Sequence, residues 1–201
     1  MQIVPFTPAH WEDAAALLAA RVRALRVDLP VLPARYEQAD ALLPPLAELA
    51  GRAPGVAALE DGRLVGFLTA MSLPSFKGKR SAFSPEWANA AAADQHAGTI
   101  YQALYAALAP TWLANGCYLH ALRVFAHDRA GLQGLYWQGF GLNNVDAVRD
   151  VSPVDTSNGE RHRVSASSAC LRNSVSGVLQ IRQATADDIE IVAALGDALQ
   201  R

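Results

Sequence analysis

The sequence predicts an α/β fold of the mixed α+β kind, with a mixed central sheet and helices on both faces. Apolar, β-branched segments alternate along the chain with segments whose leucines recur at helical spacing, the order expected when helices connect strands. The 201 residues are 51% hydrophobic and 18% charged. This composition can bury one sizeable core and excludes a disordered chain.

The first part of the chain predicts a short strand followed by two helices. Residues 2–6 are apolar enough for a strand, and a helix over about 11–27 follows them. A second helix is expected over about 35–50. Pro44 and Pro45 should end or bend it, because proline lacks a backbone donor and clashes with the preceding turn.

The strongest local signal is the pair Asp61-Gly62, which separates apolar segments at 55–60 and 63–73. Asp-Gly favours a two-residue turn in which both residues have positive φ angles. Because the flanking segments are rich in strand-forming residues, the sequence predicts a β-hairpin here.

The alternation of strands and helices continues to residue 151. Ile100, Leu104 and Leu108 mark one face of a long helix, and Asn115-Gly116 is a typical C-terminal stop. The expected elements are, in chain order, a loop over 74–79, a strand over 81–89 that Pro85 interrupts, a helix over 95–115, a strand over 117–126, a short helix over 129–138 and a strand over 142–151.

Beyond residues 1–151, the sequence predicts a Ser-rich linker over 152–178 and an unfinished second domain over 179–201. The last segment repeats the start of the chain without a gap, which indicates an internal duplication. One strand and one helix cannot bury a core, so this segment should pack on the first domain, exchange with a neighbouring subunit or stay mobile. A chance match in an Ala-rich sequence is the alternative. The matched pairs include Gln2 and Gln180, Ile3 and Ile181, Thr7 and Thr185, and Leu17 and Leu195.

Composition and charge argue against several partners. The formal charge is -2 with a pI near 6.2, and the arginines are scattered, so no basic field attracts nucleic acid. No apolar run approaches the roughly 20 residues of a membrane span, and no targeting signal opens the chain. Cys117 and Cys170 are too few for a disulfide framework and lack metal-ligand spacing. We therefore expect a cytoplasmic protein that uses no metal.

The order of elements, with the short helix ending in Gly139-Phe140, resembles the GNAT N-acetyltransferase superfamily over residues 2–151. With its unfinished second domain, the chain is similar to the N-terminal half of a tandem-GNAT protein. The resemblance implies an acyl-CoA N-acyltransferase fold with acetyl-CoA as co-substrate. It also implies an opening between the fourth and fifth strands for the pantetheine arm, with the pyrophosphate at the N-terminus of the long helix.

The family's pyrophosphate pattern is Gln or Arg, two residues, Gly, one residue, then Gly or Ala. Gln95 and Gly98 match it, whereas Ile100 stands where a small residue is expected. The loop therefore binds the coenzyme poorly or not at all, or binds it differently; the alternative is an ordinary helix start capped by Asp94. The cofactor-binding residues that the resemblance implies are Gln95, His96, Ala97, Gly98, Thr99 and, after the fifth strand, Asp128.

Catalytic residues are carried over from the resemblance by position. Tyr136 is the candidate acid for the leaving thiolate, although Leu135 holds the family's place four residues before Gly139, and a packing role for Tyr136 is the alternative. Glu86 is the nearest candidate to the carboxylate that the family often uses as a base on the fourth strand. His120 is not carried over from the family; it is a further titratable group near the expected cleft that could deprotonate the substrate amine. Glu86 is otherwise a solvated side chain beside a proline.

Two functions of different class remain open. The first is acetyl-CoA-dependent N-acetylation of a primary amine on a small molecule or peptide. The second is a non-catalytic GNAT-fold domain with a degenerate cofactor loop, which serves as a ligand-binding or assembly module. A homodimer is compatible with both, because an unfinished domain exposes apolar surface. Sequence motifs of serine hydrolases, P-loop NTPases and dinucleotide-dependent dehydrogenases are absent.

Overall fold

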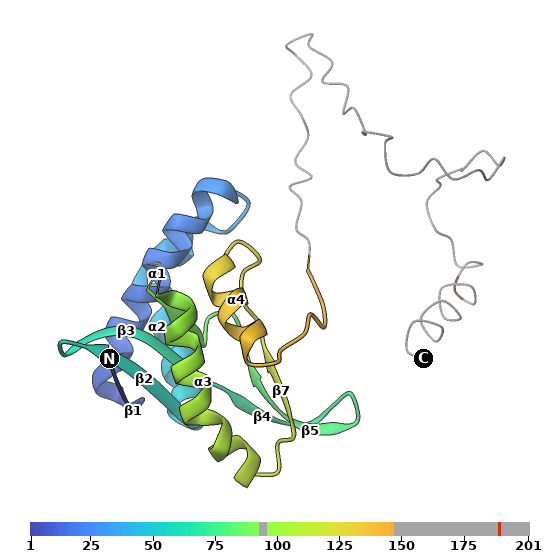
Figure 1. The fold of residues 1–201 in the computed structure, drawn as a ribbon. Helices are drawn as coiled ribbons and strands as arrows, with labels where there is room; N and C mark the ends of the chain where they lie inside the picture. The colour runs from blue at the N-terminus through green and yellow to red at the C-terminus, as the bar shows by residue number, and fades with distance from the viewer. Residues whose placement is uncertain (93–95, 147–188, 190–201) are drawn as a thin grey trace, which may run out of the picture. The chain divides into compact units, whose positions relative to one another are not determined.

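The computed structural model describes residues 1–92, 96–146 and 189 (Figure 1). The chain separates into two units, residues 1–151 and 152–201, and the helices and strands given below all belong to the first. The expected linker at 152–178 and the expected second-domain start at 179–201 lie outside the described residues, apart from Ile189.

The first unit alternates strands and helices much as the sequence predicts. A hairpin, a long helix and a short final helix follow the two N-terminal helices (Figure 1). The elements are β1 (Gln2–Pro5), η1 (Pro8–His10), α1 (Trp11–Asp28), η2 (Ala34–Glu37), α2 (Ala39–Ala50), β2 (Gly55–Glu60), β3 (Arg63–Thr69), β4 (Met71–Phe76), β5 (Lys79–Ser84), β6 (Asn89–Ala91), α3 (Ala97–Ala114), β7 (Leu119–Leu122) and α4 (Arg129–Trp137).

The strands form two linked sheets. The first has the order β1-β2-β3-β6 and is antiparallel, and the second has the order β4-β5-β7, in which β5 and β7 are parallel. Because β4 follows β3 after one residue and β6 follows β5 after a short turn, one long hairpin runs through both sheets. The mixed sheet that the sequence predicts is therefore confirmed.

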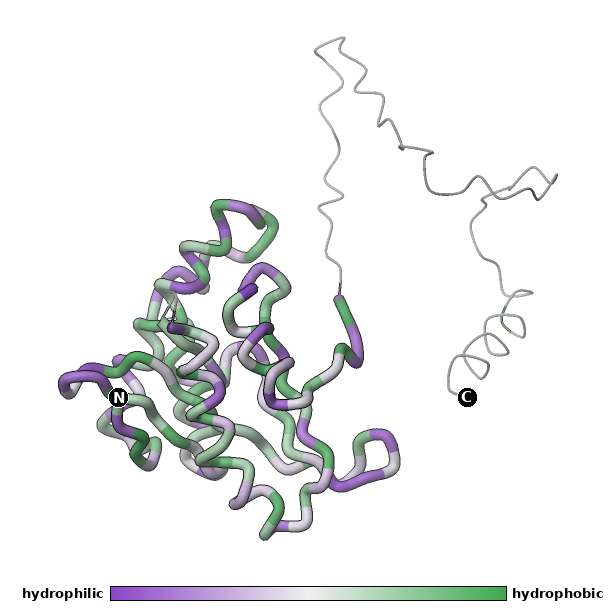
Figure 2. The backbone as a smooth tube through the Cα atoms, viewed as in Figure 1, coloured by the Kyte–Doolittle hydropathy of each residue, from purple (hydrophilic) through white to green (hydrophobic). Residues whose placement is uncertain are grey.

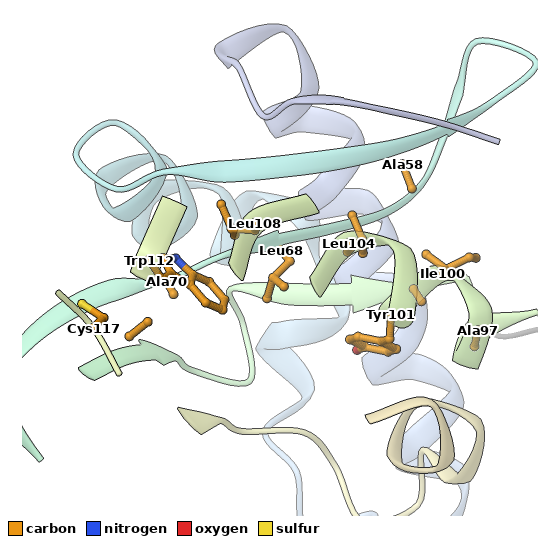
Figure 3. Close-up of a cluster of buried hydrophobic side chains, with 12 residues drawn as sticks. Ala58, Leu68, Ala70, Ala97, Ile100, Tyr101, Leu104, Leu108, Trp112 and Cys117 are labelled. Atoms are coloured by element: carbon orange, nitrogen blue, oxygen red, sulfur yellow. The ribbon is translucent and has the colours of Figure 1, made fainter. Parts of the chain in front are cut away.

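Helices cover both faces of the first sheet. Successive strand residues point to opposite faces, so Phe67 packs toward α1 and α2 while Leu68 packs toward α3. Figure 3 shows the α3 side of this core, where Leu104 and Leu108 lie over Leu68. The sheet is thus buried on both sides.

Two tight turns shape the hairpins. Asp61 and Gly62 have φ angles of 50° and 77°, which confirms the predicted turn between β2 and β3. Lys77 and Gly78 have φ angles of 51° and 73° and form a second turn of this kind. The expected loop over 74–79 is therefore wrong, because β4 and β5 pair up to Phe76 and Lys79 and leave only Lys77 and Gly78 in the turn. Figure 2 shows hydrophilic residues at the tips of both hairpins.

Pro44 and Pro45 do not end the helix, since α2 continues through both prolines. Leu42, Leu46 and Leu49 recur at helical spacing and are buried, so their packing offsets the backbone bonds that the prolines remove. The interruption comes earlier, between η2 and α2.

Two further strand predictions need correction. The strand expected over 117–126 is shorter, because only β7 pairs with a neighbour. The described part of the strand expected over 142–151 is residues 142–146, and these form no strand: their side chains are exposed, so no core contact holds them extended. The remainder lies outside the described residues. Within the described part of the chain, no helix is long and apolar enough to cross a membrane.

Candidate functional site

The central feature of the site is the place where two neighbouring strands part. β5 and β7 pair in parallel up to Ser84 and Leu122, and the N–H of Arg123 donates to the Ser84 carbonyl at 2.8 Å. The chain then turns through residues 85–88 into β6, which pairs with β3 on its other side. We call the space between β6 and residues 123–128 the strand gap.

One edge of β6 faces this strand gap. Ala88 O and Ala92 N–H bond to Thr69 and Val65 on the β3 side. Because bonding direction alternates along an antiparallel strand, the N–H and C=O groups of Asn89 point toward the strand gap. An extended chain lying in the strand gap would find backbone partners there.

Arg21 fills part of the strand gap. Its side chain is 6% exposed and extends from α1 on one face of the sheet to Tyr101 of α3 on the other. Nη1 donates to Tyr101 Oη at 2.8 Å and to Asn89 O at 3.3 Å. Nη2 pairs with Asp128 Oδ2 at 2.5 Å, and the guanidinium lies 5.5 Å from the centre of the Phe125 ring. The arginine therefore contacts both sides of the strand gap.

Asn89 and Tyr101 complete a buried polar network. The amide of Asn89 donates to Pro85 O at 2.8 Å and to Arg123 O at 3.2 Å, so it bridges the point where the strands part. Tyr101 Oη donates to Asn89 Oδ1 at 3.1 Å. Burial raises the pKa of Tyr101 to about 12, and nearby Arg21 opposes this shift. The phenol is therefore neutral near pH 7.

Asp128 connects this network to α4. Its Oδ1 accepts the Gly131 N–H at 2.9 Å and caps the helix, while Oδ2 holds Arg21. A carboxylate at a helix N-terminus is also favoured by the helix dipole. Asp128, predicted as a cofactor residue, thus lies at the strand gap with both oxygens bonded.

Glu86 stands beside the strand gap in the turn between β5 and β6. Its Oε2 lies 3.7 Å from Nη1 of Arg123, whose Nη2 is 3.7 Å from Asp146. Glu86 Oε2 is buried and has no hydrogen-bond partner among the described residues. A carboxylate oxygen that is oriented by a neighbouring cation but accepts no hydrogen bond can take a proton from a nearby amine.

Comparisons with known proteins find this fold in solved structures. Neither the protein-family models nor the curated proteins contain a match. A ribosomal-protein-alanine N-acetyltransferase from Brucella melitensis is 24% identical, with a TM-score of 0.51 over 75% of this chain and 97% of that one. A probable acetyltransferase is 16% identical, with a TM-score of 0.53 over 77% and 100%. A transcriptional regulator from Bacillus halodurans is 18% identical, with a TM-score of 0.51 over 74% and 98%.

The chain has the GNAT acetyltransferase fold. In GNAT terms, β3 and β4 together form the third strand, β5 and β6 the fourth, and β7 the fifth. The strand gap is then the opening between the fourth and fifth strands that the sequence resemblance implies. These structures include acetyltransferases and a transcriptional regulator, so the likeness establishes the architecture and leaves the activity to be argued from the site.

The GNAT pyrophosphate pattern falls at the start of α3. Gln95 lies outside the described residues, His96 precedes the helix, and Thr99 is exposed. Ala97 and Gly98 face the protein instead. A Cβ on Gly98 would lie 2.8 Å from Ala130 O, so the missing side chain lets α4 approach the first turn of α3.

Ile100, the departure from the GNAT pattern, lies away from the strand gap. It is 3% exposed and packs on the sheet, where its Cγ2 would be 2.5 Å from a Cβ on Gly66. The isoleucine therefore fills the space that a glycine leaves on β3. Packing in the core therefore explains why a large side chain stands at position 100.

The two remaining catalytic candidates lie in different surroundings. Tyr136 is 45% exposed on α4, whereas Leu135 is buried. The N–H of Phe140 donates to Leu135 O and that of Gly139 to Tyr136 O, so the Gly-Phe pair ends this helix as predicted and sets its register. Tyr136 consequently projects from the outer side of α4.

His120 has both ring nitrogens engaged. Nε2 lies 2.9 Å from Cys117 O, which can only accept, so this nitrogen donates, and Nδ1 lies 2.9 Å from Tyr105 Oη. The ring also packs against Trp112 in the second half of α3. His120 is thus less suited than Glu86 to take a proton from a substrate.

Sequence reasoning missed Arg21, Asn89 and Tyr101. One signal was available for Arg21, because it stands on the apolar stripe of α1 between the buried residues Leu18 and Leu25. An arginine at a core position requires a partner. The partners themselves lie 68, 80 and 107 positions away along the chain, where no spacing rule applies. Among the described residues, no group of three His, Cys, Asp or Glu side chains is placed to bind a metal.

Proposed function

We propose that this protein is a cytoplasmic, acetyl-CoA-dependent N-acetyltransferase that acts on a primary amine of a small molecule or peptide. The observation that carries the proposal is the strand gap after Ser84 and Leu122 with Glu86 beside it. Its support comes from the GNAT fold, which this chain shares with a solved N-acetyltransferase. The pairing edge of β6 is the natural place for an extended acyl carrier.

Acetyl-CoA supplies an acetyl group activated as a thioester. The edge of β6 and the first turn of α3, with Gln95 and His96 before it, are the proposed binding elements. Helix N-termini offer unpaired N–H groups to phosphate oxygens. Asp128 lies at the other side of the strand gap, where its carboxylate orients the start of α4.

Glu86 is the proposed general base. Its Oε2, which accepts no hydrogen bond from the described residues, takes the proton that the amine loses as the new amide bond forms, and Arg123 orients the carboxylate. The departing sulfur takes a proton from solvent as the carbon–sulfur bond breaks, because Tyr136 projects from the outer side of α4. The backbone N–H of Asn89, which points toward the strand gap, polarises the thioester carbonyl. Most of the rate enhancement comes from holding the thioester and the amine close together in the right orientation.

Acetylation of a panel of primary amines tests this proposal. The full-length protein is incubated with acetyl-CoA and polyamines, aminoglycosides or short peptides, and the acetylated products are identified by mass spectrometry. Released thiol gives the rate, after subtraction of a reaction without amine that corrects for the cysteines. Replacement Glu86→Gln should lower kcat about a hundredfold or more, as loss of a general base does.

The matched control is Glu48→Gln. Glu48 is an exposed residue of α2 that pairs with Arg52, so its replacement removes an equal charge far from the strand gap. Its kcat should stay within about twofold of the parent, as for most surface substitutions. If no amine is acetylated and coenzyme causes no rise in melting temperature, the protein is a non-catalytic GNAT-fold module instead.

A further inference from the structure

The strand gap holds side chains in the place where the proposed function requires a coenzyme arm. The Asn89 carbonyl points into it and accepts from Arg21 Nη1 at 3.3 Å. In an unbroken sheet, that carbonyl would bond to a neighbouring strand. An extended pantetheine arm would need this same acceptor, so the arm and the arginine compete for it.

We propose that Arg21 is a latch across the strand gap, which must leave its partners before the coenzyme arm can enter. This inference rests on the proposed acetyltransferase function. Arg21 reaches through the sheet from α1 to α3 and α4, and its guanidinium joins the polar atoms of Asn89, Tyr101 and Asp128. Once those contacts break, the strand gap loses the side chain that spans it.

Asp128 holds the latch in its closed position. The pair it makes with Arg21 is mostly withdrawn from water, and buried charged pairs depend strongly on each other. Because Oδ1 is bonded to Gly131 N–H, the carboxylate keeps its direction whether or not Arg21 is present. The start of α4 therefore stays capped when the latch opens.

The latch lowers the apparent affinity for coenzyme. A protein that binds only in its open state has its Kd raised in proportion to the rarity of that state. Removing Arg21 or weakening its hold on Asp128 should therefore tighten binding. Since charge-assisted hydrogen bonds of this kind are lost on opening, we expect about a tenfold effect.

Calorimetric titration with acetyl-CoA tests the latch without any measurement of turnover. Arg21→Ala deletes the latch. Asp128→Asn removes the charge that holds it and keeps an oxygen for Gly131 N–H, so this variant retains the helix cap. Arg26→Ala is the control, because Arg26 is an arginine of the same helix that pairs with Glu37. The Kd should fall about tenfold in the first two variants and stay unchanged in the third.

The possible outcomes separate the latch from the proposed function. If the parent binds acetyl-CoA and Arg21→Ala binds equally or more weakly, the latch is refuted and the acetyltransferase proposal stands. If neither the parent nor any variant binds at millimolar coenzyme, both proposals fail together. Thermal melts of each variant verify folding. If Arg21→Ala does not fold, Asp128→Asn decides the result by the same comparison.

Discussion

The contact between Gly66 and Ile100 offers the sharpest test of the packing argument. A methyl group on Gly66 would lie 2.5 Å from Ile100 Cγ2, 3.1 Å from Ala90 O and 3.3 Å from Leu104 Cδ1. These distances are shorter than the roughly 3.5–4.0 Å at which carbon atoms normally pack. Gly66→Ala should therefore force the long helix away from the sheet.

The size of the effect follows from two opposing terms. Overpacking a core costs about 1–3 kcal/mol, and replacing a glycine returns about 0.5–1 kcal/mol by restricting the unfolded chain. We expect Gly66→Ala to lose about 1–2 kcal/mol of unfolding free energy. Ile100→Ala, at a site 3% exposed, should lose about 2–4 kcal/mol through the cavity it leaves.

The double variant distinguishes this reasoning from general core damage. Because the new methyl on residue 66 occupies space that the isoleucine vacates, the two losses should fall short of additivity by about 1 kcal/mol or more. Urea unfolding of the full-length protein, followed by circular dichroism, gives the free energy of unfolding of the parent, the two single variants and the double variant, which together make a double-mutant cycle. Losses that add within about 0.5 kcal/mol would show that Ile100 does not fill the space above Gly66.

Three other expectations follow from single contacts. Burial raises the pKa of Tyr101 to about 12, so the folded state keeps a proton that the unfolded state loses near pH 10. The free energy of unfolding should therefore fall by up to about 1.4 kcal/mol per pH unit between about pH 10 and pH 12. Urea unfolding at several pH values measures this slope, which Tyr101→Phe should flatten. Leu46→Ala should cost about 2–5 kcal/mol, because Leu46 is fully buried in α2; a loss below about 1 kcal/mol would contradict its role in holding the proline-containing helix. Gly134→Ala would place a methyl 2.4 Å from Gly98 O and should lower the melting temperature despite its better helix propensity, whereas an increase would mean that α4 moves freely.

Local patterns accounted for most of the architecture. The Asp61-Gly62 turn was predictable because two adjacent residues determine its backbone angles. The long helix was predictable because Ile100, Leu104 and Leu108 share one face. The prolines of α2 misled the prediction, since their cost is local whereas the compensating burial of the leucines is tertiary.

The candidate site was predictable only in part. Glu86 could be placed beside the parting strands by its position in the chain. The register of Tyr136 and Leu135 could also be counted from Gly139, and the helix end agrees with that count. The engagement of both His120 nitrogens was not predictable, because Tyr105 belongs to the preceding helix and meets the histidine only after the sheet forms.

By itself, the sequence determined the order of strands and helices as far as the short helix α4, the first hairpin turn and the face that the long helix buries, because these depend on neighbouring residues and on periods of two or 3.6 positions. Only the tertiary structure decided what lies where the strands part. Arg21, Asn89, Tyr101 and Asp128 come from α1, β6, α3 and the residue before α4. A buried guanidinium takes whichever acceptors the packed fold brings within reach, and no local pattern encodes that choice.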